Sequence, residues 1–294
     1  MDKISFHDQI QRNKTKSWIL LISTIIVFIG LGFVISVVFM LDTFLLLILS
    51  TIIAILYVWG TYANSDKIAI ASVQAKLADQ IQYRMLYHAV ENMKIASGVP
   101  MPKVYIMPGK QINAFASGKD PNHAVICVTE GCLEKLNKQE LEAVIGHEMS
   151  HIANYDIRFV TLAAVVVGAI SIFAQIFLRS LWFGGGRSKN SSGNAIFLIL
   201  AIVLAILAPI IVKIVQMAIS RKREFMADAG AVQFTRYPPG MINALKKIKN
   251  DHEKLKVPGA VAPMFFSDTT KKKISGLFQT HPPIEKRIIV LEKM

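Results

Sequence analysis

Residues 141–156 read LEAVIGHEMSHIANYD, and the HEMSH pentad inside this stretch decides how the rest of the chain has to fold. Residues four positions apart on a helix lie on one face, so His147 and His151 can offer two imidazole nitrogens to a single metal ion. Glu148, one step round the helix, can accept a proton from a zinc-activated water. The pentad therefore predicts a zinc site of the metallopeptidase type; the alternative is an ordinary polar helix surface.

The residues before and inside this stretch favour a helix. Asn137 and Glu140 have the spacing of an N-cap residue and the third helical residue, which cap a helix reciprocally. Leu141, Val144 and Ile145 supply an apolar face at helical spacing. A catalytic zinc ion commonly has three protein ligands, so we expect a third ligand from elsewhere in the chain.

Long apolar runs occupy much of the remaining sequence, in which 53% of the 294 residues are hydrophobic. Residues 18–40 and 43–62 contain no charged side chain, and each run is long enough to cross roughly 30 Å of hydrocarbon as a helix. Residues 159–178 and 195–212 have the same character, although the sequence leaves open whether they span fully. Only residues 41–43 separate the first two runs, which predicts a retained hairpin rather than a cleaved signal peptide.

Basic residues indicate the orientation of these runs. Lysine and arginine are frequent before residue 18, whereas the turn at 41–43 contains neither, so the positive-inside rule places the N-terminus in the cytoplasm. An even number of spans then leaves the HEMSH segment and the C-terminus on the same side. The predicted fold class is a mainly α integral membrane protein with four hydrophobic helices and a cytoplasmic, zincin-like α+β catalytic domain with a small antiparallel sheet.

The formal net charge of +13 raises the question of a nucleic-acid partner. No zinc-finger or RRM-like motif accompanies it, so we expect attraction to anionic lipid and no nucleic acid. Cys127 and Cys132 are the only cysteines, and in a cytoplasmic segment we expect them to be reduced and buried.

The sheet is expected between the second run and the motif helix. A helix over residues 65–97 comes first and ends at Gly98. Three segments with strand character follow and are separated by Gly and Pro turns, which predicts an antiparallel meander. The strands are residues 103–107, 112–117 and 124–129.

The middle strand contains the sequence NAFAS. Zinc peptidases commonly hold the substrate as an added strand along a sheet edge. Asn113, Ala114 and Phe115 are the candidates for that edge, and an ordinary structural strand is an equally good interpretation.

Two acidic residues lie beyond the fourth run. Glu224 and Asp228 stand four positions apart on an expected helix, so their carboxylates share one face. One interpretation is a salt-bridged surface turn beside Arg221 and Arg223. The other makes Glu224 the third zinc ligand and Asp228 the acceptor that fixes the tautomer of a ligand histidine. Topology favours the second, because an even number of spans returns Glu224 to the side of HEMSH.

Near the C-terminus, His281 precedes two prolines, Pro282 and Pro283, that suit the first turn of a final helix. His281 is either a structural residue at the start of that helix or a hydrogen-bond donor to the oxyanion of the transition state.

With HEMSH, REFMAD, NAFAS and THPPIEKRI, flanked by these apolar runs, the sequence resembles the HtpX family of bacterial membrane-bound zinc metallopeptidases, which are akin to the CaaX prenyl peptidases. The resemblance implies that His147, His151 and Glu224 bind one zinc ion per chain and that Glu148 is the general base. It also implies that Asp228 accepts a hydrogen bond from a ligand histidine and that His281 donates a hydrogen bond in the transition state. The substrate strand it implies consists of Asn113, Ala114 and Phe115.

The resemblance further implies polypeptide substrates, membrane proteins among them, cleaved on the cytoplasmic side of the bacterial inner (plasma) membrane in stress response and protein quality control. The alternative is a zinc-binding membrane scaffold or transporter without proteolysis, which substitution of Glu148 would distinguish. We divide the chain into a hairpin (1–62), a catalytic part (63–158), a second hydrophobic hairpin (159–219) and a second catalytic part (220–294).

Overall fold

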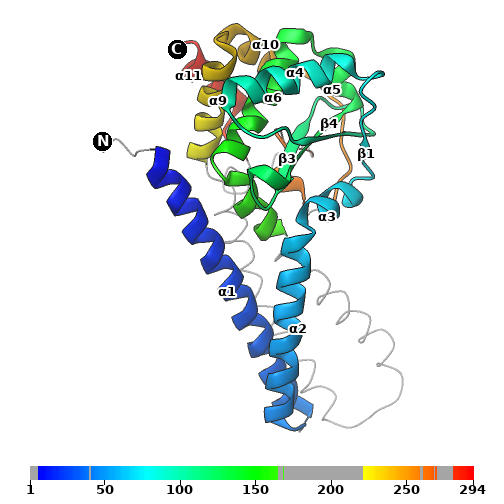
Figure 1. Ribbon diagram of the computed structural model, residues 1–294, viewed down its shortest axis with the longest axis vertical. Coiled ribbons are helices and arrows are strands. Elements are labelled where there is room, and N and C mark those ends of the chain that lie inside the picture. Colours follow the sequence, from blue (N-terminus) through cyan, green and yellow to red (C-terminus); the bar gives the residue numbers. More distant parts are fainter. Residues whose placement is uncertain are drawn as a thin grey trace.

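The computed structural model describes residues 6–39, 41–164, 168, 221–258, 261–267, 269 and 281–294. Figure 1 shows a long helical hairpin and, at one end of it, a body that carries the sheet and most of the shorter helices. The hairpin consists of α1 (Phe6–Phe39) and α2 (Thr43–Ala63). The predicted runs at 159–178 and 195–212 lie outside the described residues, apart from 159–164 and 168.

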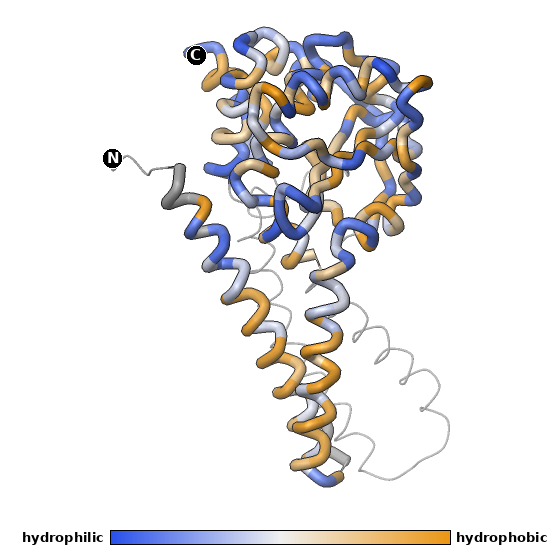
Figure 2. The backbone as a smooth tube through the Cα atoms, in the orientation of Figure 1, coloured by the Kyte–Doolittle hydropathy of each residue, from blue (hydrophilic) through white to orange (hydrophobic). Residues whose placement is uncertain are grey.

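The hairpin contains two helices that are long and apolar enough to cross a membrane. The two stretches, Asn13–Phe33 and Thr43–Ala63, have 21 residues each and mean hydropathies of 2.0 and 2.3. Figure 2 shows hydrophobic residues along most of the hairpin and hydrophilic ones near the N-terminal end of α1. Asp42 caps α2 by accepting a hydrogen bond from the Leu45 amide at 2.8 Å, so the turn between the helices is satisfied locally.

The predicted helix over 65–97 is wrong as a single element. It is divided into α3 (Ser65–Ser72), the short strand β1 (Lys76–Leu77) and α4 (Arg84–Ser97). Gln74 adopts a left-handed φ of 55°, and the Asp79 carboxylate accepts hydrogen bonds from the amides of residues 81 and 82. Such Asx contacts compete with helix formation, which is why an apolar pattern alone did not reveal the break.

Three strands form at the predicted places, but the antiparallel meander is wrong. The sheet order is β1-β2-β4-β3, with β2 parallel to β4 and β3 antiparallel to β4. The segment between β2 and β3 crosses the end of β4 instead of turning back, and the Thr129 hydroxyl holds it by donating to the Gln111 carbonyl at 2.6 Å. The strands are β2 (Lys103–Met107), β3 (Ala114–Gly118) and β4 (Ala124–Thr129).

The motif helix is α6 (Lys138–Ala153), and it begins at the predicted capping box. The Asn137 side chain accepts from the Glu140 amide at 2.9 Å, and the Glu140 carboxylate accepts from the Asn137 amide at 2.8 Å. Helix α6 packs against α4, α9 (Arg221–Thr235) and α10 (Pro238–Asn250). A Cβ on Gly230 would collide with Ser150, so glycine allows α9 to lie close to α6.

The remaining short helices complete the body around α6. They are η1 (Pro121–His123), α5 (Glu130–Lys135), η2 (Ala262–Met264) and α11 (Ile284–Leu291).

Candidate active site

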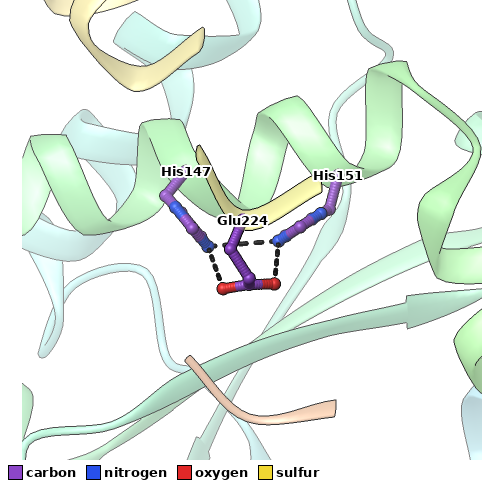
Figure 3. A group of neighbouring side chains, drawn as sticks. All are labelled: His147, His151 and Glu224. Atoms are coloured by element: carbon purple, nitrogen blue, oxygen red, sulfur yellow. Dashed lines mark hydrogen bonds and ion pairs between the residues drawn. The ribbon is translucent and has the colours of Figure 1, made fainter. Parts of the chain in front are cut away.

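Three side chains from two helices point toward one another at the centre of the body (Figure 3). The Nε2 atoms of His147 and His151, both on α6, are 3.1 Å apart. The Glu224 carboxylate, on α9, lies 3.7 Å from His147 Nε2 and 3.5 Å from His151 Nε2. These two imidazoles and one carboxylate could hold a metal ion, and such a donor set is one that catalytic zinc sites with an open position use.

Each histidine also has a carboxylate at its other ring nitrogen. His147 Nδ1 lies 2.9 Å from Asp228 Oδ1, and His151 Nδ1 lies 3.0 Å from Asp156 Oδ2. A carboxylate that accepts the Nδ1 proton leaves the Nε2 lone pair available for a metal ion. Because each Nδ1 atom has a carboxylate partner, both rings are oriented without a metal ion, and the donor set is suitable for zinc.

Asp228 is in turn held by Arg287, a fully buried residue of α11. Arg287 Nη2 donates to Asp228 Oδ1 at 2.6 Å and Nε donates to Oδ2 at 2.8 Å, and the guanidinium lies 4.6 Å from the Phe266 ring centroid. Burial alone would raise the pKa of Asp228, but the charge and hydrogen bonds of Arg287, together with the hydrogen bond to His147, outweigh burial and lower that pKa. Asp228 therefore stays ionised behind His147.

The two ligand histidines have opposite pKa shifts. Burial lowers the pKa of His147 to about 4. Burial also lowers the pKa of His151, but the hydrogen bonds of Asp156 and Glu224 outweigh it and raise that pKa to about 10. Glu224 has its pKa held well below the usual range, because the neighbouring His281 and His151 outweigh its burial. At neutral pH the metal-free site thus pairs a cationic His151 with an anionic Glu224.

Glu148 lies in the same pocket as these groups. The pocket is lined by Glu148, His151, Glu224 and His281, with Ala116 of β3 and Pro263 on its walls. Burial raises the pKa of Glu148 to about 7, although the His151 charge and a hydrogen bond from the Ala116 backbone lower it in part. A carboxylate with such a pKa can take up and release a proton near neutral pH.

His281 lies beside Glu224. Its Nδ1 lies 3.0 Å from Glu224 Oε2, and its ring is buried. Its Nε2 atom has no hydrogen-bond partner among the described residues, although it is buried beside the pocket. A buried ring nitrogen without a partner is an exception in proteins and is available to a ligand.

The three residues predicted as substrate strand lie in or beside β3, which is one of the two edge strands of the described sheet. Their outward groups are engaged by the chain itself. Asn113 Nδ2 donates to the Ser267 carbonyl at 3.0 Å, the Phe266 amide donates to the Ala114 carbonyl at 2.8 Å, and Phe115 forms a bridge with Phe265. The part of β3 that borders the pocket is Ala116.

Sequence reasoning missed two residues of this site. Asp156 follows His151 by five positions, beyond the end of α6, and helical spacing does not relate the two. Arg287 lies in the quoted THPPIEKRI stretch, and no local pattern assigns it a role. What marks Arg287 as unusual is that it is buried in a short amphipathic helix, and burial is not visible in a sequence.

Comparisons with known proteins agree with this geometry. Residues 80–294 match the family model described as Peptidase family M48. The chain is 45% identical over 252 residues to a protein named Protease HtpX homolog from Caldanaerobacter subterraneus subsp. tengcongensis, which covers 84% of each chain. A protein of the same name from Dictyoglomus thermophilum is 38% identical over 295 residues, covering 100% of this chain and 96% of the relative.

Among solved structures, the crystal structure of S. mikatae Ste24p matches with a TM-score of 0.47 and 17% identity, covering 89% of this chain and 61% of that chain. The family assignment rests on the family model and on relatives that align over nearly their full length. With the two apolar helices of the hairpin, these findings make the chain a membrane-associated metalloprotease that belongs to peptidase family M48.

Proposed function

We propose that this chain is a zinc endopeptidase that hydrolyses polypeptides with one zinc ion held by His147, His151 and Glu224. The observation that carries the proposal is the convergence of these three donor groups within 4.8 Å of one another, beside a pocket that contains Glu148. Zinc in this position would supply a Lewis acid that polarises the scissile carbonyl and increases the acidity of water.

Glu148 is the general base of this proposal. Its carboxylate accepts a proton from the attacking water and then delivers it to the departing amine, so that one group serves both proton transfers. Burial raises the pKa of this carboxylate to about 7, so both its ionised and its protonated form are present near neutral pH, which suits this exchange. Asp228 and Asp156 keep the two imidazoles oriented while the proton moves.

His281 supports the carbonyl oxygen as negative charge grows on it. In this proposal Nδ1–H bonds to Glu224, and Nε2–H donates to the carbonyl oxygen from the wall of the pocket. We propose that the substrate lies beside β3. Residues 113–115 form the part of this segment that the chain at residues 265–267 holds in place, and Ala116 lines the pocket together with Glu148. Main-chain hydrogen bonds along a strand would hold the scissile bond in register.

Substitution of the base tests the proposal. Glu148→Gln is expected to keep one zinc per chain and to lower the rate of peptide hydrolysis by about 10²–10⁴-fold, because it removes the base and leaves the ligands. Glu142→Gln is the matched control, since Glu142 lies on the same helix and bonds to Asn92 at an exposed site. Hydrolysis by Glu148→Gln at the rate of the control would overturn the proposal in favour of a zinc-binding scaffold.

The third ligand needs a separate measurement. Glu224→Ala is expected to lose zinc and activity together, as are His147→Ala and His151→Ala. Full metal content in purified Glu224→Ala protein, measured by atomic emission, would show that another residue is the third ligand.

We also propose that the chain crosses the bacterial inner membrane four times, with residues 63–158 and 220–294 and both termini in the cytoplasm, and cleaves membrane or misfolded proteins in quality control. The basic residues before the first apolar run and the charge-poor turn at 41–43 support this orientation. A reporter fused after Met294 should be active only in its cytoplasmic form. Activity of a periplasm-type reporter at that position would reverse the orientation.

A further inference from the structure

The carboxylate behind His151 has a partner from the opposite end of the chain. Asp156 uses Oδ2 for His151, and its Oδ1 accepts a hydrogen bond from Asn13 Nδ2 at 2.8 Å. Asn13 lies on α1, 143 residues away in sequence, at the beginning of the stretch that can cross a membrane. Both side chains are buried, so water does not substitute for this contact.

The amide of Asn13 makes a second contact that fixes its direction. Nδ2 also donates to the backbone carbonyl of Asn154 at 3.0 Å, so both hydrogens of the amide can be used at once. The residue between these two acceptors, Tyr155, has a left-handed φ of 58°. A non-glycine residue adopts that conformation only when its surroundings hold it. Asn13 therefore bridges the ends of a strained turn directly after the metal helix.

Further contacts hold α1 against this turn. Lys14 Nζ lies 4.6 Å from the Tyr155 ring centroid, and the Arg158 guanidinium lies 5.7 Å from the Trp18 ring. Leu20 packs in one buried cluster with Phe159 and with two further apolar residues of the segment after the turn. These contacts fix the height and the rotation of α1, and thereby the position of the Asn13 amide.

We propose that Asn13 is a positioning residue of the metal centre, which acts through Asp156 on the orientation of His151. By this chain of contacts, the first helix of the membrane hairpin is a structural part of the zinc site. The inference rests on the proposed zinc site. It predicts that a change at Asn13 weakens metal binding although this residue touches neither metal nor substrate.

The test uses the full-length protein in detergent and measures zinc affinity by competition with a fluorescent chelator. Asn13→Leu keeps the branched shape of the side chain and removes both donors, and it is expected to raise the zinc dissociation constant by about tenfold, at the lower end of the range for groups that orient a ligand. Ser17→Ala is the matched control. Ser17 is buried one turn further along α1, and its hydroxyl donates to the Asn13 backbone carbonyl within the same helix.

A double variant shows whether the effect passes through the carboxylate. Asp156→Ala is expected to raise the dissociation constant by up to about a hundredfold, and adding Asn13→Leu to it should change nothing more. The absorption spectrum of the Co²⁺-substituted protein should differ from wild type in Asn13→Leu and should be unchanged in Ser17→Ala. The spectrum reports ligand geometry and does not depend on the amount of active enzyme.

The outcomes separate the inference from the function on which it rests. Wild-type zinc affinity and an unchanged Co²⁺ spectrum in folded Asn13→Leu protein would overturn the inference and leave the proposed peptidase intact; Asn13 would then serve only to anchor α1. A wild-type protein that binds zinc with the expected dependence on Asn13 but cleaves no polypeptide would overturn the proposed function alone. A wild-type protein without zinc affinity would overturn both.

Discussion

His147 and His151 are one turn apart on the same helix, yet different regions of the molecule support them. Behind His147 is Asp228, on a helix of the catalytic body, and the side chains of both are almost completely buried. Behind His151 is Asp156, which accepts a hydrogen bond from Asn13 on the first helix of the hairpin. The His151 side chain is 16% exposed, compared with 1% for His147. The interior of the body thus supports His147, and its junction with the helical hairpin supports His151.

The charges behind the two histidines differ as well. Asp228 has a full counter-charge in the bidentate Arg287. Asp156 has a neutral amide at 2.8 Å, and the Arg223 guanidinium is farther away at 3.7 Å. A carboxylate whose charge is neutralised by an arginine raises the pKa of its histidine less than a carboxylate with a weaker counter-charge does. Two histidines one turn apart on a helix can therefore differ in their chemistry.

The largest expected effect comes from removing the counter-charge on the buried side. Arg287→Leu would leave the buried Asp228 carboxylate with His147 but without its counter-charge, and breaking a buried ion pair in this way typically costs about 3–5 kcal/mol. We expect a clear fall in the thermal midpoint of the detergent-solubilised protein together with loss of zinc. Lys249→Leu is a control, because its ion pair with Glu285 is half exposed. Equal midpoints for the two variants would contradict the importance given to Arg287.

A third imidazole–carboxylate pair sharpens the comparison, because His281 bonds to Glu224 but is not one of the three residues whose donor atoms converge. His281→Ala should lower kcat by about a hundredfold or more, equivalent to roughly 2.7–4 kcal/mol, with little change in zinc content or KM. Steady-state kinetics with a fluorogenic peptide would measure this. Activity that falls only in proportion to folded protein would make His281 a structural residue.

The two carboxylates can be compared directly by matched substitutions. Asp228→Asn and Asp156→Asn both keep the shape of the side chain and should weaken zinc binding by about 10–100-fold. We expect the larger loss for Asp228→Asn, because it also leaves the buried Arg287 without its counter-charge. Chelator competition gives both values. A larger loss for Asp156→Asn would place the dominant support at the hairpin junction.

The smallest expected effect is a proton count. His151 has its pKa raised to about 10 and His147 has its pKa lowered to about 4, so only His151 carries a proton in the metal-free protein at pH 7. Zinc binding should then release about one proton from the histidines, and affinity should increase as pH rises toward 10. Calorimetry in buffers of different ionisation enthalpy measures the release. In the Glu148→Gln protein, where residue 148 contributes no proton, two protons released at pH 7 would contradict the assigned difference between the histidines.

The same shift has a consequence for the metal-free protein. The pKa of His151 lies above its ordinary value of 6.5, so its ion pairs stabilise the folded state fully below about pH 6.5. That contribution is lost as pH rises through about 10. Thermal midpoints of the metal-free protein should fall over this interval, and less so in Asp156→Asn.

Local features of the fold could be predicted well because local residues produce them. The Asn137–Glu140 capping box starts α6 at the predicted place, and the apolar runs of the hairpin form α1 and α2. The sheet was predicted only in part. Its strands follow from short apolar segments, but the parallel pairing of β2 with β4 depends on where the connection across Thr129 leads. Nothing within a strand encodes its neighbour.

Helical periodicity places His147 beside His151 and Glu224 beside Asp228 wherever those helices lie, so the chemical groups of the candidate site could be predicted from the sequence. The groups behind the two histidines could not, because they depend on the tertiary structure. Arg287 reaches Asp228 across 59 residues, and Asn13 reaches Asp156 across 143. Contacts at such separations depend on how whole helices pack, and a repeat of 3.6 residues carries no information about that packing.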